Sequence, residues 1–568
     1  MNSVAPFLVF YAGAAVAGAT RGVLRSAVMI AVPLIGAANL LAMSGDFRVT
    51  ATLFDYTLTL TSVDRLSTLF GYLFHLAALL AIVFSLHVKD TTQHVSGLLY
   101  AGSAVGAVYA GDLITLFLFW EMLAVSSAFL ILARQTERAV RAAMRYLVIQ
   151  VLSGVILLAG VLIRLHVTGS AAFGPIGLGS IYDLNGLGSW LIFLAFGIKC
   201  AFPLLHNWLT DAYPEATPTG TVFLSAFTTK VAVYALARGY AGTEILVYIG
   251  AVMTMFPIFF AVIENDLRRV LGYSMINQIG FMVCGIGLGT QLAINGAVSH
   301  AFNDVIFKGL LFMSMGAVLH RTGKINGSDL GGLYRSMPKT AFFCIVGAAS
   351  ISAFPLFSGF VSKSMVMVAA LHEGHPIVWL ALLFASAGVF HHAGIKIPFF
   401  AFFSHDSGIR CEEAPRNMLI AMGVAAAVCV FNGSYPWVLY SMLPYPVDYA
   451  PYTWAHVLSQ FQLLFFSALA FCLLKLSGLY PPELPGINID AEWSYRRLLP
   501  RLTRGLVKAF APLDRGVRNI FLGGVNGLIS GVSRYIGPGG VMAKSLPAGD
   551  MVFWAIAFLA IYLIVYFV

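Results

Sequence analysis

The sequence predicts an all-α polytopic membrane protein. Hydrophobic residues make up 59% of its 568 residues, charged residues make up 10%, and the mean hydropathy is +0.84. Soluble domains carry about a quarter charged residues, so a chain this apolar belongs in a lipid bilayer. This composition excludes a cytosolic enzyme, a nucleic-acid binder and a disulfide-stapled secreted module.

Apolar windows of about 20 residues, the length that crosses a bilayer as a helix, predict about sixteen transmembrane helices. Each is expected to be helical, because the strands of a membrane barrel would show alternating rather than unbroken apolar runs. The centres lie near Ala14, Leu34, Leu76, Ala104, Met122, Leu152, Leu194, Phe227, Met253, Val283, Leu311, Ile351, Ala385, Val424, Phe465 and Leu559.

The basic residues are distributed unequally between the loops. Fifteen Lys and Arg residues fall in the odd-numbered short loops, and four, Arg48, Arg65, Arg164 and Arg238, fall in the even-numbered ones. Because cytoplasmic loops carry the excess of positive charge, the odd loops are predicted to be cytoplasmic and both termini to lie on the outer, periplasmic side. The expected location is the bacterial cytoplasmic (inner) membrane.

Five lysines, and none of the 23 arginines, fall inside the predicted spans: Lys199, Lys230, Lys308, Lys363 and Lys396. Arginine stays charged under almost all conditions, whereas a buried lysine can become neutral and so can gain and lose a proton. An ionised lysine at the bilayer centre costs about 2.5 to 3.5 kcal/mol on insertion scales. A single lysine could snorkel to the interface, but five together favour a function.

Glu121 lies about ten residues into its span, after Asp112, which places it near mid-membrane at about 1.5 Å per residue. It is interpreted as the anionic partner of a lysine, with a structural acid satisfied by a neighbouring helix as the alternative. Lys199 and His206 have the spacing of two turns on one helical face. Pro203 between them predicts a kink or an unwound turn, as in transporters that build ion sites from interrupted helices.

His300, Asp304 and Lys308 are spaced four residues apart in HAFNDVIFKGLLF and so form a polar stripe on one helical face. Because histidine titrates near neutrality, this stripe can pass a proton along its length. Such a face needs another polar helix or water beside it rather than lipid. Lys230 ends the apolar run TVFLSAFTTK in a preceding span.

Two further lysines lie next to helix-breaking residues. Lys363 follows Pro355 in a segment predicted to be a broken helix. Lys396 follows His391 and His392, but adjacent residues on a helix point about 100° apart and no third ligand is evident, so a metal site is not predicted. The six cysteines are scattered singly, and therefore no redox centre, structural zinc or other cofactor is expected on the chain.

An amphipathic pattern begins at Tyr495 and ends at Phe521, with apolar residues every three or four positions opposite six basic ones. It predicts a helix lying in the cytoplasmic interface, bent at Pro512 and at Gly523 and Gly524. Contact with a neighbouring subunit is the preferred interpretation, and a surface helix that binds only lipid is the alternative. The last span has no charged residue and no histidine between residues 551 and 568 and is expected to anchor the far end.

Five of these segments, in this order, resemble those of a known family. FWEM, KCAFPLLHNWLTDA followed by a lysine in the next span, NDLRRVLGYSMINQIGF, HAFNDVIFKGLLF and FPLFSGFVSK are similar to motifs of the antiporter-like proton-translocating subunits. Such subunits occur in respiratory complex I, in membrane-bound hydrogenases and in multisubunit Mrp-type sodium/proton antiporters. The resemblance covers residues 63–403.

The resemblance implies two inverted repeats with broken helices, and it assigns roles to single residues. Glu121 looks like the family's acid on the fifth helix, and Lys199 looks like its lysine partner on the broken seventh helix. Lys230 resembles the central lysine on the eighth helix. Lys363 resembles the terminal lysine on the broken twelfth helix.

One position departs from the family's pattern. His300 and Lys308 fit the ends of a His, His, Lys stripe, but the middle position is Asp304 here. A carboxylate beside Lys308 should make that lysine release a proton less readily. Lys396 has no firm counterpart in the family.

Five regions follow along the chain. They are N-terminal transmembrane helices (1–62), the antiporter-like core with its inverted repeats (63–405), additional transmembrane helices (406–480), a lateral amphipathic helix (481–548) and an anchoring helix (549–568).

The predicted function is proton translocation by one membrane subunit of a larger complex, with coupling to sodium left open. Its translocating residues would be Glu121, Lys199, Lys230, His300, Asp304, Lys308 and Lys363, with His206, His391 and Lys396 as secondary candidates. Two alternatives stay open: the proton-channel subunit of a bicarbonate-accumulating or hydrogenase enzyme complex, whose partner carries the chemistry, and a non-conducting scaffold. No redox or hydrolytic chemistry is expected on this chain itself.

Overall fold

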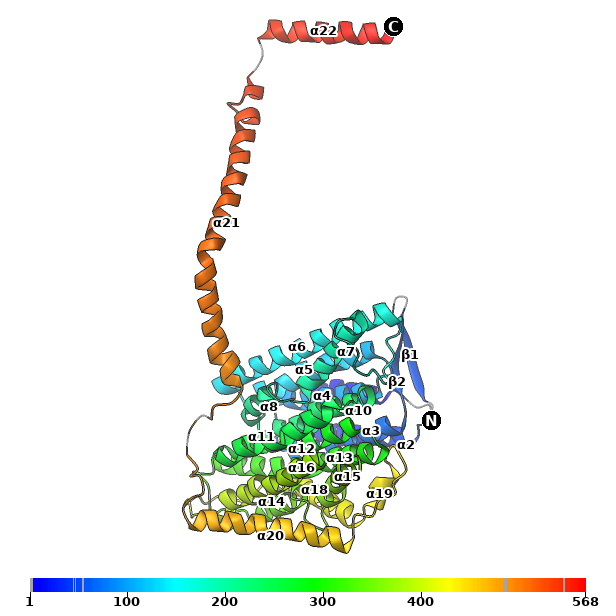
Figure 1. Ribbon diagram of the computed structural model, residues 1–568, viewed down its shortest axis with the longest axis vertical. Helices are drawn as coiled ribbons and strands as arrows, with labels where there is room; N and C mark the ends of the chain where they lie inside the picture. The colour runs from blue at the N-terminus through cyan, green and yellow to red at the C-terminus, as the bar shows by residue number, and fades with distance from the viewer. Residues whose placement is uncertain are drawn as a thin grey trace. The chain divides into compact units, whose positions relative to one another are not determined.

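The computed structural model describes residues 4–43, 45, 47–53, 56–484, 486, 488–544 and 547–567. Two compact units make up the chain, Met1–Asn488 and Ile489–Val568. The protein is an all-α polytopic membrane protein, with one small β-hairpin among its described residues. Figure 1 shows the helices of the first unit running side by side.

Twelve helical stretches in the described residues are long and apolar enough to cross a membrane. Three shorter apolar helices, Pro6–Ala19, Leu184–Lys199 and Pro338–Ile351, accompany them. The expected count of about sixteen spans is therefore not confirmed. One physical reason is that two of the expected spans contain a proline and are each divided into two shorter helices.

In chain order the first unit contains α1 (Pro6–Ala19), α2 (Gly22–Leu41), β1 (Arg48–Leu53), β2 (Tyr56–Ser62), α3 (Arg65–Ser85), α4 (Thr91–Tyr109), α5 (Leu113–Leu132), α6 (Glu137–Thr168), α7 (Leu184–Lys199), α8 (Asn207–Ala212), η1 (Tyr213–Glu215), α9 (Gly220–Ala226), α10 (Thr228–Gly239), α11 (Ile245–Ile263), α12 (Leu267–Leu288), α13 (Gln291–Thr322), α14 (Pro338–Ile351), α15 (Ser358–His372), α16 (Pro376–Val389), η2 (Phe390–Ile395), α17 (Lys396–Pro398), η3 (Phe399–Phe403), α18 (Arg416–Ser434), α19 (Trp437–Ser441) and α20 (Trp454–Leu476).

Two series of helices within this unit follow the same plan. Asp112 and Asp266 cap the N-termini of α5 and α12 by accepting hydrogen bonds from backbone N–H groups of the first turn. The following helices, α6 and α13, are both 32 residues long, and each ends at a left-handed glycine, Gly169 and Gly323. The chain then returns to pair with the capping aspartate, Asp112 with Ala172 and Asp266 with Asn326.

A β-hairpin that the sequence analysis did not anticipate lies at one end of the first unit (Figure 1). Its strands β1 and β2 pair antiparallel, and their Thr-rich alternation in RVTATL and YTLTLTS is the local signal for them. The backbone N–H of Thr59 donates to the Asp112 carboxylate at 2.6 Å, and that of Gly111 donates to the Thr59 carbonyl at 2.9 Å. The hairpin therefore covers the start of α5, and this end is called the hairpin side below.

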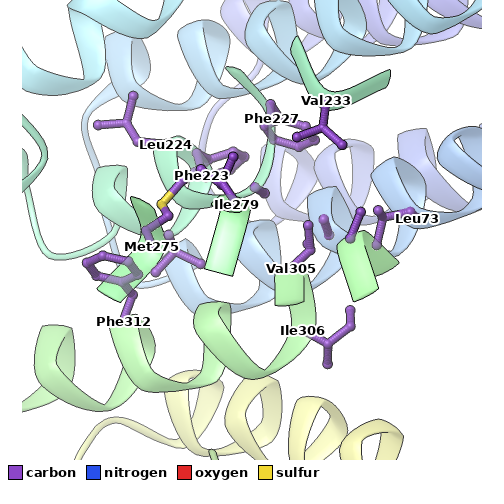
Figure 2. Close-up of a cluster of buried hydrophobic side chains, with 14 of the residues drawn as sticks. Leu73, Phe223, Leu224, Phe227, Val233, Met275, Ile279, Val305, Ile306 and Phe312 are labelled. Carbon is purple, nitrogen blue, oxygen red and sulfur yellow. The ribbon is translucent and has the colours of Figure 1, made fainter. Parts of the chain in front are cut away.

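The centre of the first unit is formed by α9, α10, α12 and α13. Every residue of the apolar window in α12, and 94% of the window in α13, is buried, whereas only 17% is buried in α20. Figure 2 shows the apolar side chains that fill this centre. The labelled ones are Leu73, Phe223, Leu224, Phe227, Val233, Met275, Ile279, Val305, Ile306 and Phe312. Polar residues on α12 and α13 are thus shielded from lipid.

The second unit contains a long amphipathic helix. After a π-helical turn, η4 (Ser494–Leu498), α21 (Leu499–Ile536) runs for 38 residues, which is about 57 Å at about 1.5 Å per residue. It continues through Pro512 and reaches beyond Phe521, where the sequence pattern ended. Within this unit no described residue of α21 is buried. A 3₁₀ turn, η5 (Val541–Ala543), and the apolar α22 (Ala548–Phe567) complete the chain.

Candidate functional site

Two helix breaks lie at corresponding positions of the two series. Helix α7 ends at Lys199 and α8 begins at Asn207, and helix α14 ends at Ile351 and α15 begins at Ser358. Both breaks carry the same four residues, Ala-Phe-Pro-Leu, at 201–204 and 353–356. The alanine and leucine have φ of 62° and 69° in the first break and 58° and 75° in the second. Proline disfavours helical backbone in the residue before it, so the ladder opens at these points.

The expectation that Lys199 and His206 share a helical face is wrong. Lys199 and His206 do not share a helical face, because the helix stops at Lys199 and His206 only precedes α8. The proline unwinds the segment instead of kinking it, and the register between the two residues is lost. His206 packs against Phe256 of α11, with ring centroids 4.7 Å apart.

Lys199 is completely buried at the end of α7, against α5. Its Nζ donates a hydrogen bond to the carbonyl oxygen of Trp120 and lies 4.4 Å from the centre of the Trp120 ring. The next residue on α5, Glu121, interacts electrostatically with Lys199. Glu121 Oε1 is buried without a hydrogen-bond partner among the described residues. The structure thus brings the predicted acid and lysine together.

Glycine at position 154 of α6 leaves room for the Glu121 carboxylate. A Cβ atom built at Gly154 would overlap Glu121 Oε1. On the same helix, Ser153 accepts a hydrogen bond from Trp120 Nε1 at 3.1 Å and donates to the Ala195 carbonyl of α7 at 2.8 Å. Helix α6 therefore fixes the distance between α5 and α7 at the level of the Glu121–Lys199 pair.

Asp304 of α13 forms an ion pair with Lys230 of α10. Lys230 Nζ lies 2.7 Å from Asp304 Oδ2, and neither side chain is exposed. The sequence placed Asp304 beside Lys308, but its direct partner is on another helix. Lys308 instead donates to Ser274 Oγ of α12 at 2.7 Å. Side chains one helical turn apart compete with closer partners across a helix interface, and here the interface partner is nearer.

Lys363 and His300 extend this cluster toward the second break. Lys363 Nζ donates to the Ile351 carbonyl at 3.0 Å, at the C-terminal end of α14, and lies 5.2 Å from the Phe281 ring centre. That helix end carries partial negative charge and favours a cation. His300 Nδ1 lies 3.1 Å from Ser362 Oγ, beside Lys363. The charge of Asp304 also acts on Lys308 and Lys363.

Buried amides beside the cluster were missed by the sequence analysis. Asn303 donates to the Ser358 carbonyl at 2.9 Å and accepts from Asn432 of α18 at 3.0 Å. On α12, Gln278 donates to Asn277 at 2.6 Å. A single asparagine in an apolar run is a weak signal, and only packing shows that Asn303 of α13 joins α15 and α18 through buried hydrogen bonds.

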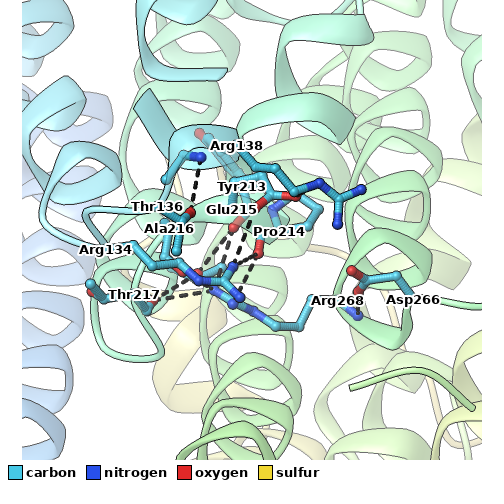
Figure 3. Close-up of polar contacts among 12 residues, drawn as sticks. Arg134, Thr136, Arg138, Tyr213, Pro214, Glu215, Ala216, Thr217, Asp266 and Arg268 are labelled. Atoms are coloured by element: carbon cyan, nitrogen blue, oxygen red, sulfur yellow. Dashed lines mark hydrogen bonds and ion pairs between the residues drawn. The ribbon is translucent and has the colours of Figure 1, made fainter. Parts of the chain in front are cut away.

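Helix α5 starts at the hairpin and ends before Arg134, so Arg134 lies at the opposite end of the unit. Figure 3 shows the polar contacts of Arg134 and its neighbours there, Arg138 and Arg268. Arg134, just beyond α5, and Arg268, at the start of α12, both donate to the carbonyl of Pro214, at 2.9 and 3.0 Å. The C-terminal end of α5 and the N-terminal end of α12 therefore lie on the same side, called the basic side below. The two series of helices run in opposite directions.

Arg268, at the start of α12, is buried. Its guanidinium also donates to the carbonyls of Ala216 and Thr217, at 3.0 and 3.2 Å, and to the Thr221 hydroxyl. Arginine carries five donors in a fixed fork, which suits a ring of carbonyl oxygens. Arg268 thus holds the segment between α8 and α9, and with it the far side of the first break.

Residues 110–390 match the family described as "NADH:quinone oxidoreductase/Mrp antiporter, TM". The resemblance to the antiporter-like subunits is confirmed. This segment contains both helix breaks and every residue of the Glu121–Lys199 and Lys230–Asp304 pairs.

Relatives of this core are similar at moderate identity. Hydrogenase-4 component B of Escherichia coli is 26% identical over 414 residues, which are 64% of this chain and 61% of that protein. A Na(+)/H(+) antiporter subunit of Alkalihalophilus pseudofirmus is 31% identical over 293 residues, 49% of this chain and 59% of that protein. The chain thus spans about three-fifths of the length of these relatives.

A solved structure matches the fold over nearly the whole chain. A chain of the membrane-bound sulfane sulfur reductase (MBS), an archaeal respiratory membrane complex, aligns with a TM-score of 0.72 at 23% identity. The alignment covers 99% of both chains. The similarity of fold therefore includes the region of α21 and α22 as well as the antiporter-like core.

Proposed function

We propose that this protein is a proton-translocating membrane subunit of a larger complex. The observation that carries the proposal is the Lys230–Asp304 ion pair at 2.7 Å, with both side chains unexposed. It lies in a cluster with Lys308 and Lys363, whose charges Asp304 also influences. Ionisable groups inside a membrane are costly to retain, and their usual role is to carry ions or protons.

The Glu121–Lys199 pair is the input of the proposed path. Separating the Glu121 carboxylate from Lys199 removes the field that keeps Lys199 charged, so its proton moves on toward Lys230. The break after Lys199 supports this role, because the unwound segment can shift the lysine without moving a whole helix. The next residue, Cys200, already lies within the electrostatic reach of Lys230.

The remaining residues divide the path into a relay and an exit. Lys230, Asp304, His300 and Lys308 form the central relay, and Lys363 at the second break is the exit site. Asp304 replaces a second histidine of the related pattern. Its pairing with Lys230 supports a role as the counter-charge that stabilises the protonated form of Lys230 after a proton has arrived from Lys199.

We place the basic side in the cytoplasm and both termini outside, in a bacterial inner membrane, because cytoplasmic loops carry the excess of Lys and Arg. Helix α21 would lie along the cytoplasmic interface and hold a neighbouring membrane subunit. Its length of 38 residues, its amphipathic pattern and the full-length fold match support this arrangement.

Two variants and one control test the function. Lys199→Ala and Glu121→Ala should abolish proton transport in inverted vesicles, measured with a pH-sensitive dye, while the complex still assembles. Lys324→Ala, a lysine exposed on a loop of the basic side, should transport normally. Transport at the unaltered rate in both Lys199→Ala and Glu121→Ala would contradict the assigned roles. Repeating the assay with and without sodium decides whether sodium is carried.

A further inference from the structure

The helix that carries Lys396 departs from α-helical geometry on both sides of this residue. The π-helical turns η2 (Phe390–Ile395) and η3 (Phe399–Phe403) flank the short α17 (Lys396–Pro398). The turns of a π-helix are rare, and they are found frequently at functional sites. The function proposed above gives Lys396 no role.

Lys396 is tied to two other segments of the first unit. Its Nζ donates to the carbonyls of Val262 and Glu264 at 2.6 and 2.7 Å, at the C-terminal end of α11. It also lies 2.9 Å from Glu483 Oε1, with side-chain exposures of 0% for Lys396 and 6% for Glu483. Burial raises the pKa of the Glu483 carboxyl, and the Lys396 ammonium opposes this effect. Lys475 is a further charge that acts on Glu483.

His392 lies in η2, four residues before Lys396 on the same irregular helix. The ring is completely buried, and neither nitrogen has a hydrogen-bond partner of ordinary geometry among the described residues. The titratable groups that act on it are Lys308 of the relay, His391 beside it and Lys396, and the backbone of Gly388 also acts on it. The imidazole therefore lies within electrostatic reach of both Lys308 of α13 and Lys396 of the Lys396–Glu483 pair.

The Lys396–Glu483 pair lies near the basic side of the unit. Glu264 precedes Asp266, the cap of α12, and its carboxylate accepts from Asn488 at 3.1 Å and lies 3.9 Å from Arg269. Because Lys396 donates to the backbone of Glu264, the Lys396–Glu483 pair lies next to the arginine cluster of that side.

We propose that His392, Lys396 and Glu483 form a branch of the proton path that connects Lys308 with the basic side of the membrane core. The branch rests on the proposed function and adds a way in or out that the residues of the antiporter-like motifs do not supply. A proton bound by Glu483 passes to neutral Lys396, then to His392 and on to Lys308, or in the reverse order. Each step breaks one N–H or O–H bond and forms another, so no further reactant is needed.

The competing explanation is that Lys396 and Glu483 only tie the segment after α20 to the core. Two features favour the branch. A buried imidazole whose nitrogens lack well-formed hydrogen bonds costs free energy that an apolar side chain would avoid, so a purely structural role does not account for His392. Arginine would also make a stronger and permanently charged tie than lysine at position 396.

Two variants distinguish these explanations. Lys396→Arg keeps the positive charge and the donors but cannot give up a proton, and His392→Phe fills the same space without a proton site. If the branch conducts, each should lower proton transport by about a hundredfold, the lower end of the effect of removing a positioned proton-transfer group. Assembly of the complex, checked by native gel, should be unchanged, and His392→Phe should raise thermal stability. Glu483→Gln should lower proton transport in the same way, and Glu373→Gln, which changes an exposed acid just beyond α15, is its control and should transport normally.

Lys199→Ala, measured in the same vesicles, separates the two levels of the proposal. If Lys199→Ala is inactive while Lys396→Arg and His392→Phe transport normally, the branch is wrong and the proposed function stands. If the vesicles that hold the unaltered protein move no protons, the proposed function fails and the branch fails with it. If Lys396→Arg does not assemble, His392→Phe decides alone, and normal transport in it overturns the branch.

Discussion

Replacing Asp304 by asparagine should destabilise the protein through one buried charge. Lys230 Nζ and Asp304 Oδ2 are 2.7 Å apart with no exposed surface, and two unit charges at that distance attract by about 6 kcal/mol at an effective dielectric constant of about 20. Desolvation offsets part of this attraction. Removing one partner of such a pair costs about 3–5 kcal/mol, because the other charge stays buried and uncompensated.

A double-mutant cycle isolates the pair. Asp304→Asn alone should lower the free energy of unfolding by about 3–5 kcal/mol, whereas Asp304→Asn combined with Lys230→Gln should recover much of it, because no unpaired charge remains. Glu137→Gln breaks the exposed ion pair with Arg141 at 3.3 Å and should change the free energy by less than about 1 kcal/mol.

The assay is denaturant unfolding of the purified protein in detergent micelles, read by circular dichroism. Asp304→Asn should also slow proton transport, since Lys230 loses its counter-charge. The reasoning is refuted if Asp304→Asn unfolds like Glu137→Gln, or if the double variant is no more stable than the single one.

Three further predictions follow from other contacts. Gly154→Ala should displace the Glu121 carboxylate and slow transport, whereas Gly272→Ala, where the added Cβ meets only ordinary contacts, should not; equal rates in the dye assay would contradict the role of Gly154. Arg268→Lys should lower the unfolding free energy by about 1–3 kcal/mol, because carbonyls buried under the guanidinium lose their donor; an unchanged unfolding curve would refute this. Truncation after Pro481 should loosen the complex on a native gel while the core helices remain inserted, and a truncated chain that assembles and transports normally would refute the lateral-helix assignment.

Local sequence features determined much of the fold. The apolar composition set the membrane environment, because unpaired backbone groups and charges are costly in lipid. Pro203 and Pro355 determined where two spans open, since proline acts on its own backbone and on the residue before it. The repeat of apolar residues every three or four positions indicated the amphipathic helix, because helical periodicity is a property of neighbouring residues.

The ionisable residues of the site were also evident from sequence, and the resemblance paired Glu121 with Lys199, but the partners of Asp304 and Lys396 were not evident. The spacing of Asp304 and Lys308 suggested a pair within one helix. In the structure Asp304 forms its ion pair with Lys230 of another helix instead. Lys396 was evident as a lysine in an apolar run, but its partner Glu483 lies in a segment far along the chain. No sequence feature indicated that Arg268 is buried.

The sequence by itself thus determined the membrane environment, the breaks in the helices and the set of ionisable residues. Tertiary structure alone decided that Asp304 pairs with Lys230 and Glu483 with Lys396. The physical reason is range: helix formation and proline breaks depend on residues a few positions apart, whereas an ion pair depends on how two helices pack. Lys230 and Asp304 form an ion pair because α10 and α13 are in contact. The distance between these two helices cannot be predicted from a pattern of neighbouring residues.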